Sequence, residues 1–177
     1  MEGALVAPLF LLIIFGVFEF GLLFRSYLTL SSGVRAAARA ASTAGSDANA
    51  DFLILQSITN NTRALKTSQI QVIVIFKATS TTTPVPTACL TASVSTGSTP
   101  CNRYVSTDLA RPIAQFGCLT GGPDTAWCPT ARKDRLSDPP DYIGVYMKVQ
   151  HKYATGVFGG TKTLTDTVIM RVEPARL

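Results

Sequence analysis

The stretch GALVAPLFLLIIFGVFEFGLLF, at residues 3–24, decides the architecture of this chain. Glu19 is its one ionisable side chain. A helix needs about 20 mainly apolar residues, at about 1.5 Å per residue, to cross a hydrocarbon core of about 30 Å. The stretch therefore predicts a transmembrane helix.

Two alternative interpretations of this stretch fit less well. A cleaved secretory signal has a basic start and an apolar run of about 7 to 15 residues, followed by small residues at the cleavage site. Small residues do follow at 36–41, but the chain opens with Met1 and Glu2 and its apolar run is longer. A helix in the core of a soluble domain has a polar face, whereas this stretch is apolar on all sides apart from Glu19.

Glu19 and Pro8 are unusual residues for a membrane span. A carboxylate near the centre of a bilayer costs about 2.5 kcal/mol or more, and less near an edge. We therefore expect Glu19 to be paired, protonated, in contact with a helix partner, or placed at the shallow edge of the span. Pro8 removes one backbone hydrogen bond, so it either kinks the helix or lies in its first turn.

The composition indicates an apolar environment and excludes a typical nucleic-acid-binding protein. Charged residues make up 15% of the 177 residues, against about 25% in an ordinary soluble domain. The formal net charge is +5, but Lys and Arg are scattered singly, apart from the adjacent Arg132 and Lys133. Because nucleic-acid binding requires cations gathered on one face, we expect no nucleic-acid partner.

The four cysteines, Cys89, Cys101, Cys118 and Cys128, lie in one segment rich in Thr, Pro and Gly. Their spacings are much wider than those of a zinc site, so we expect disulfides rather than metal ligands, with free buried thiols as the alternative. Sequential pairing, Cys89 with Cys101 and Cys118 with Cys128, is the first choice among three connectivities. Disulfides indicate an oxidising compartment outside the cytoplasm.

The charges beside the span conflict with that orientation. Arg25, Arg35 and Arg39 follow the span and no cation precedes it, so the positive-inside rule would place the C-terminal part in the cytoplasm. The cysteines indicate the opposite. We follow the cysteines and expect a single-pass protein with an extracytoplasmic domain, whose sequence begins near a processing site preceded by a basic leader.

The order of residues along the first quarter of the chain resembles the TadE-like family of pilin-related proteins. The similarity starts with Glu2 and Pro8 and includes FGVFEFG at 15–21. It continues through the small-residue, Arg-containing stretch SSGVRAAARAA at 31–41. The segment TVIMRVE at 167–173 is similar to the last strand of many such proteins, which is supporting evidence only.

The resemblance implies a minor pilin or pseudopilin of a bacterial tight-adherence (Flp-type) pilus, a relative of type IV pili. Such a protein is inserted in the inner membrane, is processed by a prepilin peptidase, and contacts other pilins or assembly proteins through its N-terminal helix. The resemblance assigns Glu2 to the register between subunits, and Pro8 and Glu19 to the same helix-assembly surface. The chain departs from the family pattern in that Met1 alone precedes Glu2.

Beyond the span, the sequence predicts an α+β domain. The stalk part of the first helix should continue to about residue 44 and break at 45–47, which divides a transmembrane and stalk unit (1–45) from a small domain (46–177). Apolar periodicity gives the remaining elements. They are an amphipathic helix at 52–65, strands at 69–78, 143–149 and 164–172 in an antiparallel sheet, and a turn at 156–160.

A long insertion at about 79–141 separates the first two predicted strands. It contains all four cysteines and a possible short helix at 108–116. Trp127, Phe116 and Tyr104 either form a partner-binding or adhesive surface or pack as a small core on the disulfides. Trp127 is the candidate for surface contact.

The sequence offers no arrangement of residues for catalysis. His151, the lone histidine, lies in a predicted strand, so we expect a structural or exposed side chain rather than a member of a catalytic triad. Asp134, Asp138 and Asp141 lack the order and the glycine of a calcium loop. We expect no enzyme, no cofactor and no metal. The alternative to a pilin is a membrane-tethered extracytoplasmic module for binding or adhesion, whose helix is an anchor alone.

Overall fold

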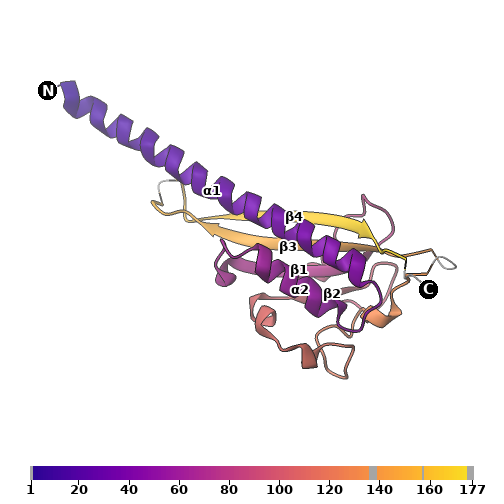
Figure 1. The fold of residues 1–177 in the computed structure, drawn as a ribbon. Coiled ribbons are helices and arrows are strands. Elements are labelled where there is room, and N and C mark those ends of the chain that lie inside the picture. Colours follow the sequence, from indigo (N-terminus) through magenta and orange to yellow (C-terminus); the bar gives the residue numbers. More distant parts are fainter. Residues whose placement is uncertain (1, 136–138, 157, 175–177) are drawn as a thin grey trace.

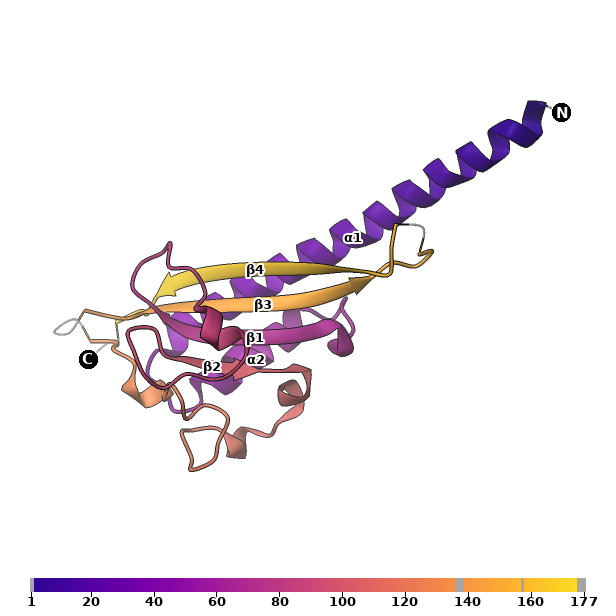
Figure 2. The same ribbon diagram turned by 180° about the vertical axis from the view of Figure 1, so that it is seen from behind.

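The computed structural model describes residues 2–135, 139–156 and 158–174, and the side chains from residue 6 onward within these ranges. A long helix projects from a small domain in which two helices pack on a sheet (Figures 1 and 2). The helices are α1 (Glu2–Ala44) and α2 (Ala50–Asn61), and the strands are β1 (Ile70–Ala78), β2 (Cys101–Tyr104), β3 (Tyr142–Lys152) and β4 (Thr161–Arg171). The predicted α+β class is therefore confirmed.

The sheet has four antiparallel strands in the order β2-β1-β3-β4. The three predicted strands are β1, β3 and β4. The fourth, β2, comes from the insertion and pairs its four residues with β1, for example Tyr104 opposite Ile73. The expectation of about three strands was thus one strand short.

The C-terminal half of α1 and the whole of α2 lie on one face of the sheet (Figure 1). A stripe of small residues on α1 faces this core, where Ala37, Ala38 and Ala41 are completely buried. Gly33 lets α1 approach the end of α2 closely, because a Cβ atom at that position would lie 2.4 Å from Cγ2 of Thr62, the residue after α2. Small side chains therefore set the short distance between the helices.

The break between the helices lies where the sequence predicted it. Gly45 has a φ of +52°, a left-handed conformation that suits glycine at the end of a helix. Asp47 Oδ1 then accepts a hydrogen bond from the Asn49 amide at 2.7 Å, just before α2 begins. The second helix is shorter than the predicted 52–65: it ends at Asn61, and Leu65 is buried in the core beyond it.

The insertion covers the opposite face of the sheet, so β1 is buried on both sides. Val72, Val74 and Phe76 pack there with the disulfide-bonded Cys89 and Cys101, whereas Ile73 and Ile75 face the helices. Two-sided burial explains why the sequence of β1 is almost continuously apolar.

The prediction of a short helix at 108–116 is wrong. Two separate 3-10 segments replace it, Ser106–Ala110 and Ile113–Gln115. Pro112 explains the difference, because the residue before a proline is pushed out of the helical region. Arg111 accordingly has an extended conformation, with φ −66° and ψ 137°.

Candidate helical assembly site

The N-terminal half of α1 projects away from the domain (Figure 1), and the turn between β3 and β4 contacts it at Gly16, Glu19 and Phe20. Its large apolar side chains are mostly exposed, with exposed fractions from 43% at Phe15 to 71% at Val17. The exposed members are Val6, Leu9, Phe10, Leu11, Leu12, Ile13, Ile14, Phe15, Val17, Phe18, Phe20 and Phe24. We call this surface, residues 6–24 of α1, the bare half.

Within the described residues, one helix is long and apolar enough to cross a membrane. It covers Val6–Ala44 and has a mean hydropathy of 2.4 in its most apolar part. Pro8 is exposed in the bare half, and α1 continues through it. Glu2 lies in the first turn of α1, but its side chain is outside the described part of the structure.

The carboxylate of Glu19 is fully buried by the turn between β3 and β4. It accepts hydrogen bonds from the Ala154 amide at 3.1 Å, from the Thr155 hydroxyl at 2.7 Å and from the Thr155 amide. Of the environments expected for this residue, the structure shows the paired one, with partners in the same chain. Hydrogen bonds to a carboxylate are stronger than neutral ones and offset the loss of water around the charge.

Aromatic packing holds the same turn against α1. The rings of Phe158 and Phe20 lie 5.6 Å apart, and Phe158 also covers Gly16. Gly16 is one helical turn before Glu19, so the turn contacts one continuous strip of the helix. No local pattern indicated these partners, because they lie 135 or more residues further along the chain in a turn of ordinary composition.

The two disulfides join the residues expected from sequential pairing. Cys89 bonds to Cys101 and Cys118 to Cys128, and no cysteine is left free in the described chain. The first disulfide ties the start of the insertion to β2. The second closes a loop that contains Asp124, whose Oδ2 accepts the Gly117 and Cys118 amides at 2.8 and 3.1 Å.

A buried polar network, unforeseen from the sequence, connects the insertion to α2. Asp51 on α2 forms an ion pair with Arg132, and both side chains are completely buried. Asp51 Oδ2 also accepts hydrogen bonds from the Tyr104 hydroxyl at 2.6 Å and from Asn102 Nδ2 at 2.7 Å. Burial raises the pKa of Tyr104 well above its ordinary value, and the neighbouring Asp51 raises it further, so the hydroxyl stays a donor.

Trp127 belongs to this buried network, so of the two alternatives for this residue the surface contact is wrong. It is 5% exposed, and Phe116 and Tyr104 are buried as well. The Arg132 guanidinium lies 4.4 Å from the centre of the indole ring, and the Trp127 amide donates to Asn102 Oδ1 at 2.7 Å. The alternative, a small core beside the disulfides, is what the structure shows.

The polar groups examined as possible catalytic or metal sites have structural partners. Ser26 Oγ lies 3.0 Å from His151 Nδ1 and 3.0 Å from the Leu22 carbonyl oxygen, so both side chains have structural partners. Asp141 pairs with Lys77 at 2.9 Å, and Asp134 accepts a bond from a serine; Asp138 lies outside the described residues. In the described chain, no three His, Cys, Asp or Glu residues are placed to hold a metal.

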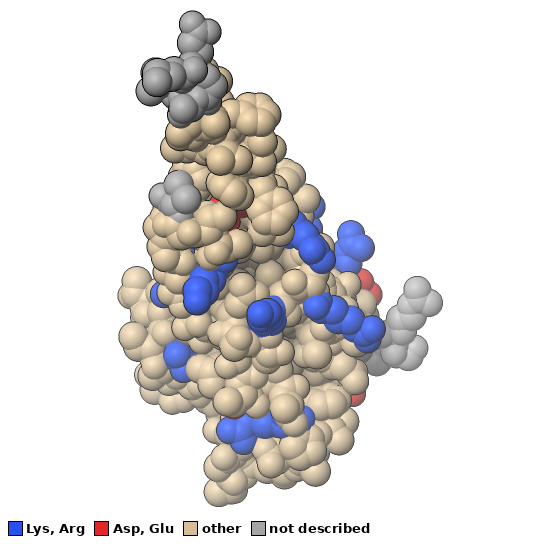
Figure 3. All heavy atoms as spheres, turned by 90° about the vertical axis from the view of Figure 1, so that its left-hand side faces the viewer, with Lys and Arg blue, Asp and Glu red and all other residues tan. Residues whose placement is uncertain are grey.

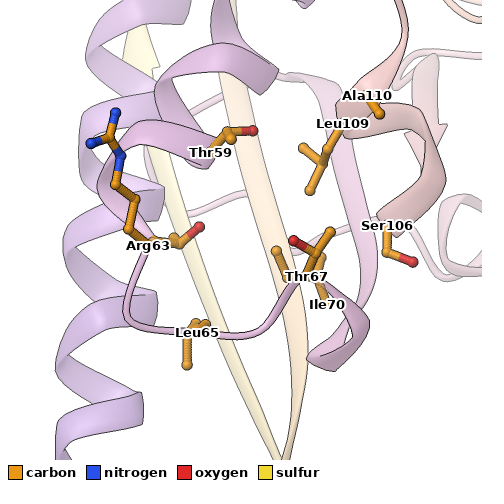
Figure 4. A pocket seen from close by; sticks show the side chains of 9 residues that line it. Thr59, Arg63, Leu65, Thr67, Ile70, Ser106, Leu109 and Ala110 are labelled. Atoms are coloured by element: carbon orange, nitrogen blue, oxygen red, sulfur yellow. The ribbon is translucent and has the colours of Figure 1, made fainter.

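A hollow of about 320 Å³ lies between the end of α2 and the 3-10 segment Ser106–Ala110 (Figure 4). Threonine and aliphatic side chains make up most of its lining. Arg63, the charged residue among those that line it, donates to Asn60 Oδ1 at 3.1 Å. The hollow therefore presents no group positioned as a nucleophile, acid or base.

The geometry defines a class of protein. A small disulfide-containing α+β domain packs on the C-terminal half of a long helix, and the N-terminal half of that helix is of the membrane-spanning type. Residues 1–39 match the family model described as TadE-like protein. This segment of the chain is thus TadE-like, as the sequence indicated, which connects the protein with Tad pili. No curated protein and no solved structure matches the chain.

The environment of Glu19 leads to a prediction about the turn at residues 153–160. Glu19→Ala removes the acceptor for the Ala154 and Thr155 amides, so we expect their hydrogen exchange, measured on the full chain in detergent, to accelerate at least about tenfold. Thr155→Val removes the hydroxyl alone and should have a smaller effect. Unchanged exchange in Glu19→Ala would show that the aromatic contacts hold the turn without the carboxylate.

The buried ion pair leads to a prediction about stability. Asp51→Ala leaves the Arg132 charge buried without its partner, and we expect the free energy of unfolding to fall by about 3–5 kcal/mol. Denaturant unfolding of the full chain in detergent can be followed through the fluorescence of Trp127, the single tryptophan. The control is Asp166→Ala on β4, which should change stability by about 0.5 kcal/mol or less. Equal losses in the two variants would contradict the role of Asp51.

Proposed function

We propose that the protein is a minor pilin or pseudopilin that takes part in the assembly or structure of a Tad/Flp-type pilus through the bare half of α1. The observation that carries the proposal is the division of a single helix. Residues such as Leu30 and Val34 are completely buried in the domain, whereas the apolar side chains before residue 25 have mostly no cover from it. An apolar helix surface of this size requires lipid or other helices around it.

The bare half has the features of a helix that packs against other helices in a membrane. Packing there depends on close contact, which small residues allow, rather than on the exclusion of water. A Cβ atom at Gly21 would meet no atom of the described chain within 4 Å, so this backbone position is open to a neighbouring helix. The proposed partners are other pilins or pilus-assembly proteins.

The proposed location is the inner membrane of a bacterium, with a single pass and the domain outside the cytoplasm, or a surface pilus after assembly. The two disulfides support the extracytoplasmic side, because such bonds persist in oxidising compartments. The protein would act through assembly rather than catalysis. One argument for the alternative, a tethered binding module, was an exposed aromatic surface. That argument no longer holds, because Trp127, Phe116 and Tyr104 are buried.

The test is a helix replacement in the cells that make this protein. Residues 6–24 are replaced by an unrelated apolar span of equal length that keeps Gly16, Glu19 and Phe20, so that the contacts with the turn remain. We expect the variant to reach the membrane at normal levels, to be absent from sheared surface fibres by mass spectrometry, and to reduce piliation several-fold. A fully functional replacement would contradict the proposal and favour a module for which the helix is an anchor alone.

A further inference from the structure

A cationic hollow lies beside α1, immediately below the bare half. It has a volume of about 610 Å³ and is formed by α1, by the segment that precedes β1, and by the end of β3. Arg25, Lys66 and Lys152 line it, and no Asp or Glu does. In the described chain none of these three side chains forms an ion pair. The residues that line the hollow therefore include three cations and no carboxylate, and the Glu19 carboxylate lies next to it, bonded to the Ala154 amide.

One residue that lines the hollow also has a buried polar atom without a partner in the described chain. His151 lines it and is 5% exposed, and its Nε2 has no hydrogen-bond partner in the described chain. The Ser26 hydroxyl donates its proton to the Leu22 carbonyl at 3.0 Å. When this hydroxyl donates to Leu22, His151 Nδ1, 3.0 Å from the hydroxyl oxygen, carries the ring proton. In the neutral ring with its proton on Nδ1, Nε2 can accept a hydrogen bond from a hydroxyl or ammonium group.

The position of the hollow along α1 corresponds to the headgroup level of a membrane crossed by the bare half. A span of about 20 residues that starts at Gly3 ends at Leu22. Arg25 lies six residues beyond Glu19, which is about 9 Å further along the helix axis. Tyr27, which is 44% exposed, follows at the same level, where aromatic side chains with a polar tip are favoured. Figure 3 shows the side of the molecule from which the N-terminal half of α1 projects. Lys and Arg side chains are spread over the domain on this side, and few acidic side chains are visible there.

We propose that the hollow binds the headgroup of an anionic phospholipid. Arg25, Lys66 and Lys152 would attract the phosphate, and His151 Nε2 would accept a hydrogen bond from a headgroup hydroxyl such as that of phosphatidylglycerol. Such binding fixes the depth of α1 in the bilayer and holds the domain against the surface. The inference depends on α1 crossing a membrane and not on a role in a pilus, so the two proposals fail separately.

The experiment is native mass spectrometry of the detergent-solubilised full chain with phosphatidylglycerol or phosphatidylcholine. We expect tighter binding of phosphatidylglycerol by about tenfold or more, and loss of most of that preference in Lys66→Gln/Lys152→Gln. The matched control, Arg35→Gln/Arg39→Gln, removes two exposed cations from the lower part of α1 and should retain the preference. His151→Phe should reduce binding of phosphatidylglycerol while leaving that of phosphatidic acid, which lacks the headgroup hydroxyl, within about twofold.

Three outcomes would overturn the proposal. Equal binding of both lipids would show that the hollow does not recognise the anion. Equal loss in the two double variants would assign the effect to overall charge. Displacement of the lipid by millimolar inorganic phosphate at constant ionic strength would identify a site for the free anion instead. Circular dichroism of each variant verifies that the domain is folded before binding is compared.

Discussion

The burial of the lower half of α1 against the sheet determines the rest of the structure. Because α1 is one uninterrupted helix, fixing residues 30–41 in the core also fixes the direction of the bare half above it. The buried alanines and Gly33 allow α1 to pack closely against both α2 and the sheet. A helix fixed in this way presents its apolar upper half at a defined angle to the domain, as an assembly element requires.

The turn between β3 and β4 supplies hydrogen-bond donors to the ionisable group in the span, Glu19. Glu19 has three donors from Ala154 and Thr155 within its own chain, so a neighbouring helix need not supply a countercharge. Any contact of Glu19 with another subunit would require this turn to open. The turn also places polar backbone against α1 at Glu19, and its residue Ala154 lines the cationic hollow.

The sequence predicted the elements with strong local periodicity and missed those that depend on distant contacts. The span, the end of α1, and the strands β1, β3 and β4 follow from long apolar patterns, and the cysteine pairing agrees with the shortest loops. Strand β2 has four residues within a polar insertion and forms by pairing with β1. The pair Asp51 and Arg132 is 81 residues apart in the chain, so neither position signals the other. Trp127 was left between a surface contact and a small core, because its buried partners could not be seen.

The central claim is that the bare half of α1 contacts other proteins rather than lipid alone. Photo-cross-linking in the cells that make the protein tests this directly, with a photoreactive amino acid in place of Leu12, which is 52% exposed, and of Leu53 on α2, which is 39% exposed, as the control. The account predicts adducts from position 12 with a pilin, a pilus-assembly protein or a second copy of this chain, and none of these from position 53. Adducts with lipid alone at position 12 would contradict it.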